Sequence, residues 1–160
     1  MKHKEMLAVL KSMRILIDTR EQDTPKARRR ISVIGLPVDR VALDYGDYSY
    51  NATLPDGSDI YDLTAGRIRP ICAIERKMDL DELSSCFTHD RKRFKAEMER
   101  AAADNGTMYL LVENATWENL ISGKYRTKFN ETAFFHSMTA WIARYGLRPI
   151  FCKSETSGKR

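Results

Sequence analysis

The chain has 160 residues, of which 27 are Lys or Arg and 22 are Asp or Glu, so its formal net charge is +5. Hydrophobic residues make up 42% and charged residues 31%, which is typical of a soluble globular domain and excludes a disordered or collagen-like chain. The length suits a single mixed domain, and the positive charge favours a polyanionic partner.

The sequence shows no signal for membrane insertion or secretion, and its cysteines follow neither a disulfide nor a zinc-binding pattern. No run of residues has the apolar length of a membrane span or of a signal-peptide core, so we expect no membrane partner and a cytoplasmic protein. Cys72, Cys86 and Cys152 are far apart and form no CxxC pair, which argues against a disulfide framework and against a zinc site. We also expect no organic cofactor.

The N-terminal half predicts strands with one basic segment between them. Residues 1–12 are expected to be an extension, and residues 13–18 a buried strand that ends in Asp18. Residues 19–30 contain Pro25 and, after it, a cluster of four basic side chains, which indicates either a solvated loop or a short basic helix. Two further strands, 38–45 and 48–53, hinge at Gly46, and a turn leads to a partner strand near 60–63. This part is predicted to be an antiparallel meander.

The C-terminal half alternates predicted strands and helices. Strands are expected at residues 71–77, 107–112 and 149–152, and helices at 80–86, 90–103, 116–121 and 130–145. The first of these strands reads ICAIERK, so an apolar run passes directly into three charged residues. We therefore predict one α/β domain over residues 13–153, with a mixed central sheet flanked by helices, and a flexible tail over 154–160.

Carboxylates at strand ends suggest hydrolysis of phosphodiester bonds. This reaction needs a positioned water and neutralisation of charge on the phosphate, and Mg²⁺ held by two or three carboxylates supplies both. Glu75 and Lys77 are two residues apart on a predicted strand and share a face, whereas Arg76 points to the other face. Asp47 follows Gly46 at a strand break, where glycine permits a kink toward Glu75. A nearby lysine can orient the water.

These residues together resemble a known nuclease family. Gly46-Asp47, then Glu75-Arg76-Lys77 and Asp81, are similar to the GD…ERKxxxD signature of the XPF-family nuclease domain. Residues 17–21, IDTRE, resemble the first-strand DxRE element of that family, and the similarity extends over about residues 13–152. The resemblance implies a restriction-endonuclease-like fold and cleavage of branched, flap or junction DNA. A domain of this size is similar to phage or prophage members, which would place it in a host cytoplasm with the nucleoid.

The resemblance also assigns roles. It implies Mg²⁺ or Mn²⁺ as cofactor, DNA as partner and pairing into a homodimer. The predicted catalytic residues are Asp47, Glu75, Lys77, Arg76, Asp18, Glu21 and Asp81. The predicted metal ligands are Asp47, Glu75 and Asp18. The predicted DNA contacts are Arg20, Lys26, Arg28, Arg29, Arg30, Arg91 and Arg93.

Structural roles compete with several of these assignments. Asp81 lies in the first turn of a predicted helix, where an acidic side chain complements the helix dipole without any catalysis. The stretch from Asp47 to Glu75 is longer than in compact family members because a hairpin near residues 54–63 is inserted. Two alternatives stay open: a nicking, restriction-like or junction-resolving nuclease, and a non-catalytic DNA-binding recombination-accessory domain.

Overall fold

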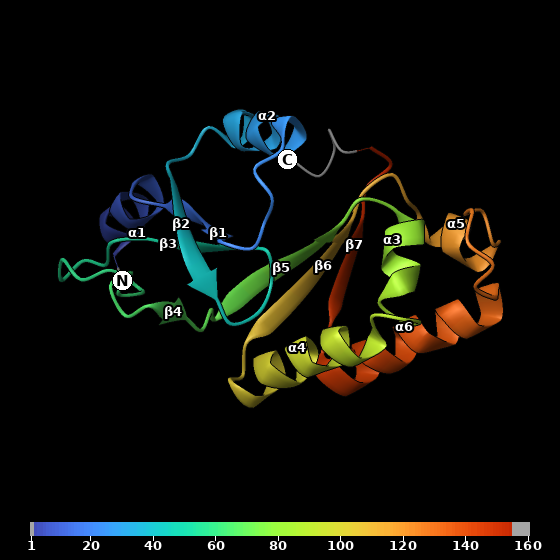
Figure 1. Ribbon diagram of the computed structural model, residues 1–160. Coiled ribbons are helices and arrows are strands. Elements are labelled where there is room, and N and C mark those ends of the chain that lie inside the picture. The colour runs from blue at the N-terminus through green and yellow to red at the C-terminus, as the bar shows by residue number, and fades with distance from the viewer. Residues whose placement is uncertain (1, 155–160) are drawn as a thin grey trace.

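The computed structural model describes residues 2–154 and shows a seven-stranded sheet with helices on both faces (Figure 1). The strands are β1 (Arg14–Asp18), β2 (Val38–Leu43), β3 (Tyr48–Asn51), β4 (Arg67–Ile68), β5 (Cys72–Lys77), β6 (Thr107–Val112) and β7 (Arg148–Phe151). The helices are α1 (His3–Lys11), α2 (Pro25–Ile34), α3 (Leu80–Ser85), α4 (Arg91–Ala103), α5 (Trp117–Ile121) and α6 (Glu131–Tyr145). The predicted α/β class with a mixed sheet is confirmed.

Strand direction decides which residues meet at one edge of the sheet. The order is β4-β2-β1-β3-β5-β6-β7. β3 is antiparallel to both of its neighbours, β1 and β5, whereas the other pairs in the sheet are parallel. The start of β3 therefore lies at the same edge as the ends of β1 and β5. The residue before β3, Asp47, is brought to the edge where Asp18 ends β1 and Lys77 ends β5.

The predicted antiparallel meander is wrong. β2 and β3 do not pair with each other, because β1 lies between them, parallel to β2 and antiparallel to β3. The predicted strand near residues 60–63 is absent within residues 2–154, and an isolated bridge from Thr53 to Asp59 closes the hairpin instead. The edge strand β4 lies slightly later and is parallel to β2. A parallel β1–β2 pair requires a crossover, and α2 supplies it.

The basic segment, for which the sequence allowed a loop or a short helix, forms the helix α2. Thr24 caps it, because its side chain accepts a hydrogen bond from the Ala27 N–H, and Pro25 occupies the first turn. Gly35 ends the helix in the left-handed conformation. The predicted N-terminal extension contains α1, and Ser12 after it exchanges hydrogen bonds with the backbone of Thr53.

The larger core lies between β5–β7 and helices α3 to α6, which cover one face of these strands, while α2 lies on the opposite face (Figure 1). The predicted helix and strand positions in this half are confirmed. Phe94 and Met98 of α4 are buried, and Phe94 stacks on Trp141 of α6. α4 thus packs its apolar face on the sheet and leaves its first turns beside the end of β5.

None of the helices between residues 2 and 154 has both the length and the apolar character needed to cross a bilayer. The predicted flexible tail falls outside the described residues from position 155 onward.

Candidate active site

Two chain segments that are distant in sequence meet at the sheet edge. The backbone N–H of Asp47 donates to the Ile74 carbonyl at 2.8 Å, and the Asp18 N–H donates to the Asp47 carbonyl at 2.9 Å. One carboxylate oxygen of Asp47, Oδ2, accepts the Arg76 N–H at 2.8 Å. Asp47 is therefore fixed between β1 and β5, immediately beside the ERK segment.

Gly46 makes this approach possible. Its φ is +77°, and a Cβ at this position would lie 2.7 Å from the Cβ of Ala73 and 3.3 Å from the Ile74 carbonyl oxygen. Real Cβ atoms do not approach so closely, so a side chain would push the turn away from β5. Glycine is needed here both for the left-handed conformation and for the close contact.

Glu75 and Lys77 share the face of β5 that is turned toward α4. Both are almost completely buried, and the Lys77 ammonium donates to Glu75 Oε1 at 2.5 Å. The same ammonium lies 5.8 Å from the centre of the Phe94 ring, a cation–π arrangement. The alternation of β5 leaves Arg76 on the opposite face, where its guanidinium pairs with Glu113. The predicted facing of these three side chains is confirmed.

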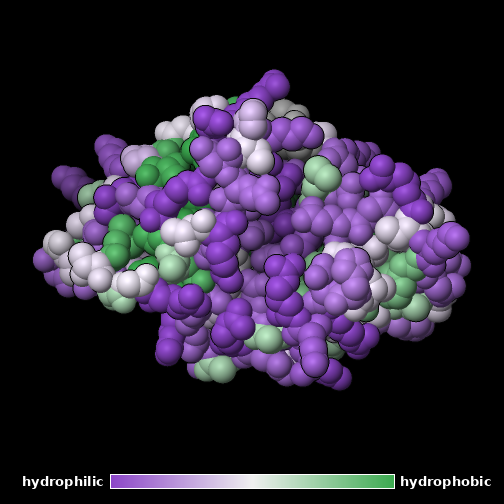
Figure 2. All heavy atoms as spheres, in the orientation of Figure 1, coloured by the Kyte–Doolittle hydropathy of each residue, from purple (hydrophilic) through white to green (hydrophobic). Residues whose placement is uncertain are grey.

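A cleft of about 550 Å³ opens above these residues, between α2 and the start of α4. Figure 2 shows that this part of the surface is hydrophilic and hollowed, whereas hydrophobic residues gather on the side that carries α1 and β2. The cleft is lined by Arg20, Glu21, Gln22, Thr24, Lys26, Arg30, Asp47, Glu75, Arg76, Lys77, Met78, Glu82, Arg93 and Glu97. Carboxylates thus lie on its floor and cations on its rims.

Burial perturbs the three central groups. It is the main reason that the pKa of Asp47 is raised to about 6 and that of Glu75 to about 8; the negative charges of Asp47 and Glu97 contribute to the shift of Glu75, and Lys77 opposes it. Burial alone would lower the pKa of Lys77, but the Glu75 carboxylate holds it above its usual value. Lys77 is thus a fixed cation, and a cation held by Asp47 and Glu75 would displace the protons of these two carboxyl groups into solvent.

The residues present fit a divalent cation. Glu75 Oε2 and Asp47 Oδ1 accept no hydrogen bond from residues 2–154. Within the described chain, His, Cys, Asp and Glu side chains form no group of three that would enclose an ion on its own. Mg²⁺ does not require such a cage, because it keeps several waters and binds through one or two carboxylates together with substrate phosphates. Asp47 and Glu75 provide a donor set of that kind.

Two predicted catalytic carboxylates are engaged elsewhere. Both oxygens of Asp18 accept hydrogen bonds, from the Arg20 backbone and guanidinium and from the Leu43 N–H, and Asp18 does not line the cleft. Asp81 accepts from Arg126 and from the Thr127 N–H, so it ties α3 to the loop before α6. These contacts favour structural roles for Asp18 and Asp81, because their oxygens are already satisfied.

Glu21 and Arg30 line the cleft as a pair. The Arg30 guanidinium and the Tyr48 hydroxyl both donate to Glu21 Oε1 at 3.1 Å. This cluster fixes α2 against the start of β3. Arg30 is mostly buried and committed to these partners, which leaves it less available to DNA than an exposed arginine.

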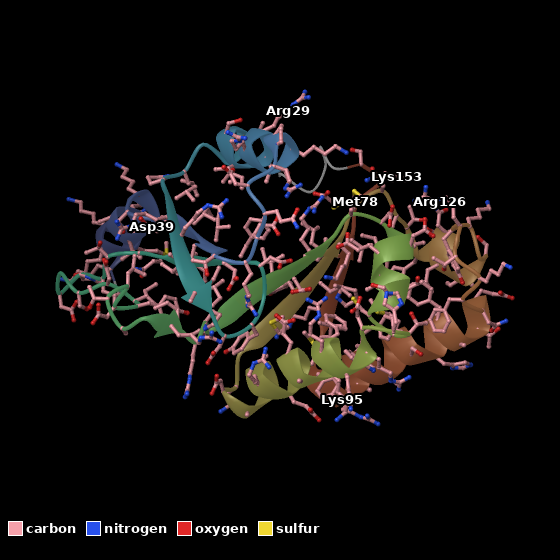
Figure 3. All side chains as sticks on the ribbon, in the orientation of Figure 1. Arg29, Asp39, Met78, Lys95, Arg126 and Lys153 are labelled. Carbon is pink, nitrogen blue, oxygen red and sulfur yellow. The ribbon has the colours of Figure 1, made fainter. Side chains whose placement is uncertain are left out.

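The predicted DNA contacts divide into two groups. Arg20, Lys26 and Arg93 lie on the cleft rims, with most of the Arg20 and Arg93 side chains exposed. Arg28 pairs with Asp23, and neither it nor Arg91 lines the cleft. Arg29 points outward from α2, away from the sheet (Figure 3). Four of the seven predicted cations thus line the cleft, and one of these four, Arg30, is committed to Glu21 and Tyr48.

Glu97 is a site residue that the sequence analysis missed. Its Oε1 accepts the Gly46 N–H at 2.7 Å from α4, and its charge raises the pKa of both Asp47 and Glu75. Glu82, also in the cleft, accepts the Met78 N–H at 2.7 Å. A signal for Glu97 exists in the sequence, since it follows Arg93 by four residues and so shares its helix face.

Comparison with solved structures gives the same fold. XPF from Aeropyrum pernix superposes with a TM-score of 0.58 at 22% identity, covering 91% of this chain and 56% of that chain. XPF from Aeropyrum pernix in complex with DNA gives a TM-score of 0.60 at 23% identity, with 91% and 59% covered. The predicted restriction-endonuclease-like fold is therefore confirmed, although this chain spans less than two thirds of either archaeal chain.

Sequence comparison gives the family. None of the curated proteins matches significantly. The ERCC4 domain family matches residues 17–158, which is most of the sequence and includes every residue of the cleft described above. With this match and the shared fold, the chain belongs to the ERCC4 domain family.

Proposed function

We propose that the chain is a Mg²⁺- or Mn²⁺-dependent DNA endonuclease that prefers branched, flap or junction DNA. The observation that carries the proposal is the convergence of the Asp47 and Glu75 carboxylates with the Lys77 ammonium on the floor of a cleft with cationic rims. A carboxylate pair beside a lysine suits phosphodiester hydrolysis, because the reaction needs charge neutralisation and an oriented nucleophile in one place. Membership of the ERCC4 domain family supports the same function.

Each residue has a distinct part in this proposal. Asp47 and Glu75 hold the divalent cation, which when bound activates water and neutralises charge on the phosphate. Lys77 stays protonated because its pKa is raised, so it acts as a hydrogen-bond donor and not as a base. It orients the attacking water or stabilises charge on the phosphate. The exposed cations on the rims hold the DNA backbone without reading bases.

The direct test is cleavage of labelled flaps, forks, four-way junctions and plain duplexes with Mg²⁺, with and without EDTA, beside the Glu75→Ala variant. We expect Mg²⁺-dependent cleavage that EDTA and the variant both abolish, with branched substrates preferred. Equal cleavage of every substrate would favour a nicking or restriction-like enzyme. DNA binding without cleavage would favour the recombination-accessory alternative, which the intact motif residues argue against. Pairing into a homodimer stays a prediction, as does a phage or prophage origin.

Divalent-cation affinity should depend on pH. The folded protein holds protons on Asp47 and Glu75 up to pH values of about 6 and 8, and a cation must displace them. At limiting Mg²⁺ we therefore expect the cleavage rate to rise by up to about tenfold per pH unit between these values. At saturating Mg²⁺ the dependence should flatten. DNA binding in EDTA over the same range is the control, and a pH-independent rate at limiting Mg²⁺ would contradict the assignment.

DNA affinity should depend on the two rims of the cleft. Lys26→Ala and Arg93→Ala each remove one expected phosphate contact, so each should lower the slope of log affinity against log salt by about 0.9. Lys95→Ala is the control on the same helix as Arg93, because Lys95 pairs with Glu99 and points away from the sheet (Figure 3). Salt titrations by fluorescence anisotropy measure the slopes. Identical slopes for Arg93→Ala and Lys95→Ala would place the DNA elsewhere.

A further inference from the structure

Two side chains of helix α4 form hydrogen bonds with the backbone of the connection between β2 and β3. Glu97 Oε1 accepts the Gly46 N–H at 2.7 Å. One turn later, the Arg100 Nε donates to the Asp44 carbonyl at 3.0 Å. A single helix thus binds a backbone donor and a backbone acceptor of the same short turn.

The turn that carries Asp47 is held at its start by a backbone hydrogen bond, in which the Asp44 N–H donates to the Ile68 carbonyl at 2.9 Å. Tyr45 within it is fully buried and donates from its hydroxyl to the Pro70 carbonyl at 2.6 Å. Asp47 is bonded to the strands on either side, so its peptide already belongs to the sheet. The Gly46 amide, directly before it, is bound by Glu97. That hydrogen bond fixes the orientation of the Gly46 amide, which lies one residue before Asp47.

We propose that Glu97 is a positioning residue for Asp47: by binding the Gly46 amide from α4, its carboxylate holds the Asp47 carboxylate beside Glu75. The significance of this role rests on the proposed function, in which Asp47 and Glu75 bind a divalent cation together. A loosened turn would let Asp47 move relative to Glu75, which is itself fixed by Lys77. Positioning partners of metal ligands typically matter 10–100-fold for affinity or activity.

Three variants separate the effect of the hydrogen bond between Glu97 and the Gly46 amide from the effect of the Glu97 charge. Glu97→Gln keeps an oxygen that can accept the Gly46 N–H and removes the negative charge, whereas Glu97→Ala removes both. Glu99→Ala is the matched control, because Glu99 lies on the same helix, is exposed, and within residues 2–154 forms its ion pair with Lys95 alone. Circular dichroism and thermal melts select variants that remain folded.

The first measurement is Mn²⁺ binding by calorimetry without DNA. We expect Glu97→Ala to weaken Mn²⁺ affinity by about 10–100-fold. Glu97→Gln should restore most of that loss, and Glu99→Ala should bind as the wild type does. A folded Glu97→Ala that binds Mn²⁺ like the wild type would overturn the proposal. So would a Glu97→Gln variant as weak as Glu97→Ala, because charge and not position would then explain the effect.

The second measurement does not depend on the metal. Hydrogen exchange of the Gly46 and Asp47 amides should accelerate in Glu97→Ala by at least about tenfold and return toward the wild-type rate in Glu97→Gln. Unchanged exchange in Glu97→Ala would overturn the positioning role even if cleavage were lost. If the wild type bound no Mn²⁺ while exchange responded as expected, the proposed function would fail and the role of Glu97 in holding the turn would stand.

Discussion

Glu75→Gln and Lys77→Met should each reduce DNA cleavage on the order of 10²–10³-fold, for different reasons. Glutamine at position 75 keeps the shape of the side chain but loses the charge that binds a cation. Methionine at position 77 keeps much of the apolar stem against Phe94 and loses the ammonium donor. Both variants should bind branched DNA at least as well as the wild type, because neither residue lies on a rim of the cleft.

Mn²⁺ affinity distinguishes the two defects. Glu75→Gln should lose affinity, since one of two ligands is gone. Lys77→Met should retain or gain affinity, since a positive charge beside the site is removed. Glu118→Gln, an exposed carboxylate on α5, serves as the control and should leave both properties unchanged. Wild-type cleavage by either site variant would remove that residue from the mechanism, and reduced Mn²⁺ affinity in Lys77→Met would mean that Lys77 organises the site and does not act on the nucleophile.

The regular elements of the C-terminal half could be predicted because local signals agree with the tertiary structure there. Asp79 caps α3 by accepting the N–H of Glu82, three residues later, and Gly146 ends α6 in the left-handed conformation. The burial of Phe94 and Met98 follows the helical period. Each of these features depends on neighbours within a few residues, which the sequence displays directly.

The strand order of the N-terminal half could not be predicted, because it depends on α2. This helix buries only Ala27 and Arg30 along its length, so its apolar face is weak in the sequence. If this segment is taken as a loop and not as a helix, the strands that follow it can be paired with one another as an antiparallel meander. Once α2 acts as a crossover, β2 becomes parallel to β1, and β3 takes the other side of β1.

The candidate site was predictable to the extent that it lies on strand ends. Asp47, Glu75 and Lys77 follow apolar runs or a glycine break, and their convergence follows from strand direction. Glu97 was missed because a helix periodicity identifies a shared face but not the loop that this face meets. The catalytic role of Asp18 stays a prediction, and its carboxylate is occupied by a local partner, Arg20, which lies two residues away in the sequence.

Gly46→Ala should be strongly destabilising, because two independent costs coincide at this position. A left-handed conformation costs a non-glycine residue roughly 1–2 kcal/mol, and forcing a methyl group into a packed site costs roughly 1–3 kcal/mol. The added Cβ would meet the Ala73 Cβ at 2.7 Å, so either β5 or the turn must move. We expect the melting temperature to fall by roughly 5–15 °C, and cleavage to fall with it as Asp47 is displaced.

Two companion variants separate these costs. Gly66 has a φ of +84°, and among residues 2–154 no heavy atom other than those of its own chain neighbours lies within 4 Å of an added Cβ, so Gly66→Ala carries the conformational cost alone. Ala73→Gly removes the atom that clashes, and the double variant Gly46→Ala with Ala73→Gly should therefore recover part of the lost stability in a double-mutant cycle. If Gly46→Ala melted no lower than Gly66→Ala, or if the cycle were additive, the close contact between the turn and β5 would not constrain Asp47. A cycle with a clear favourable coupling would show that Asp47 is placed by the backbone packing that only glycine permits.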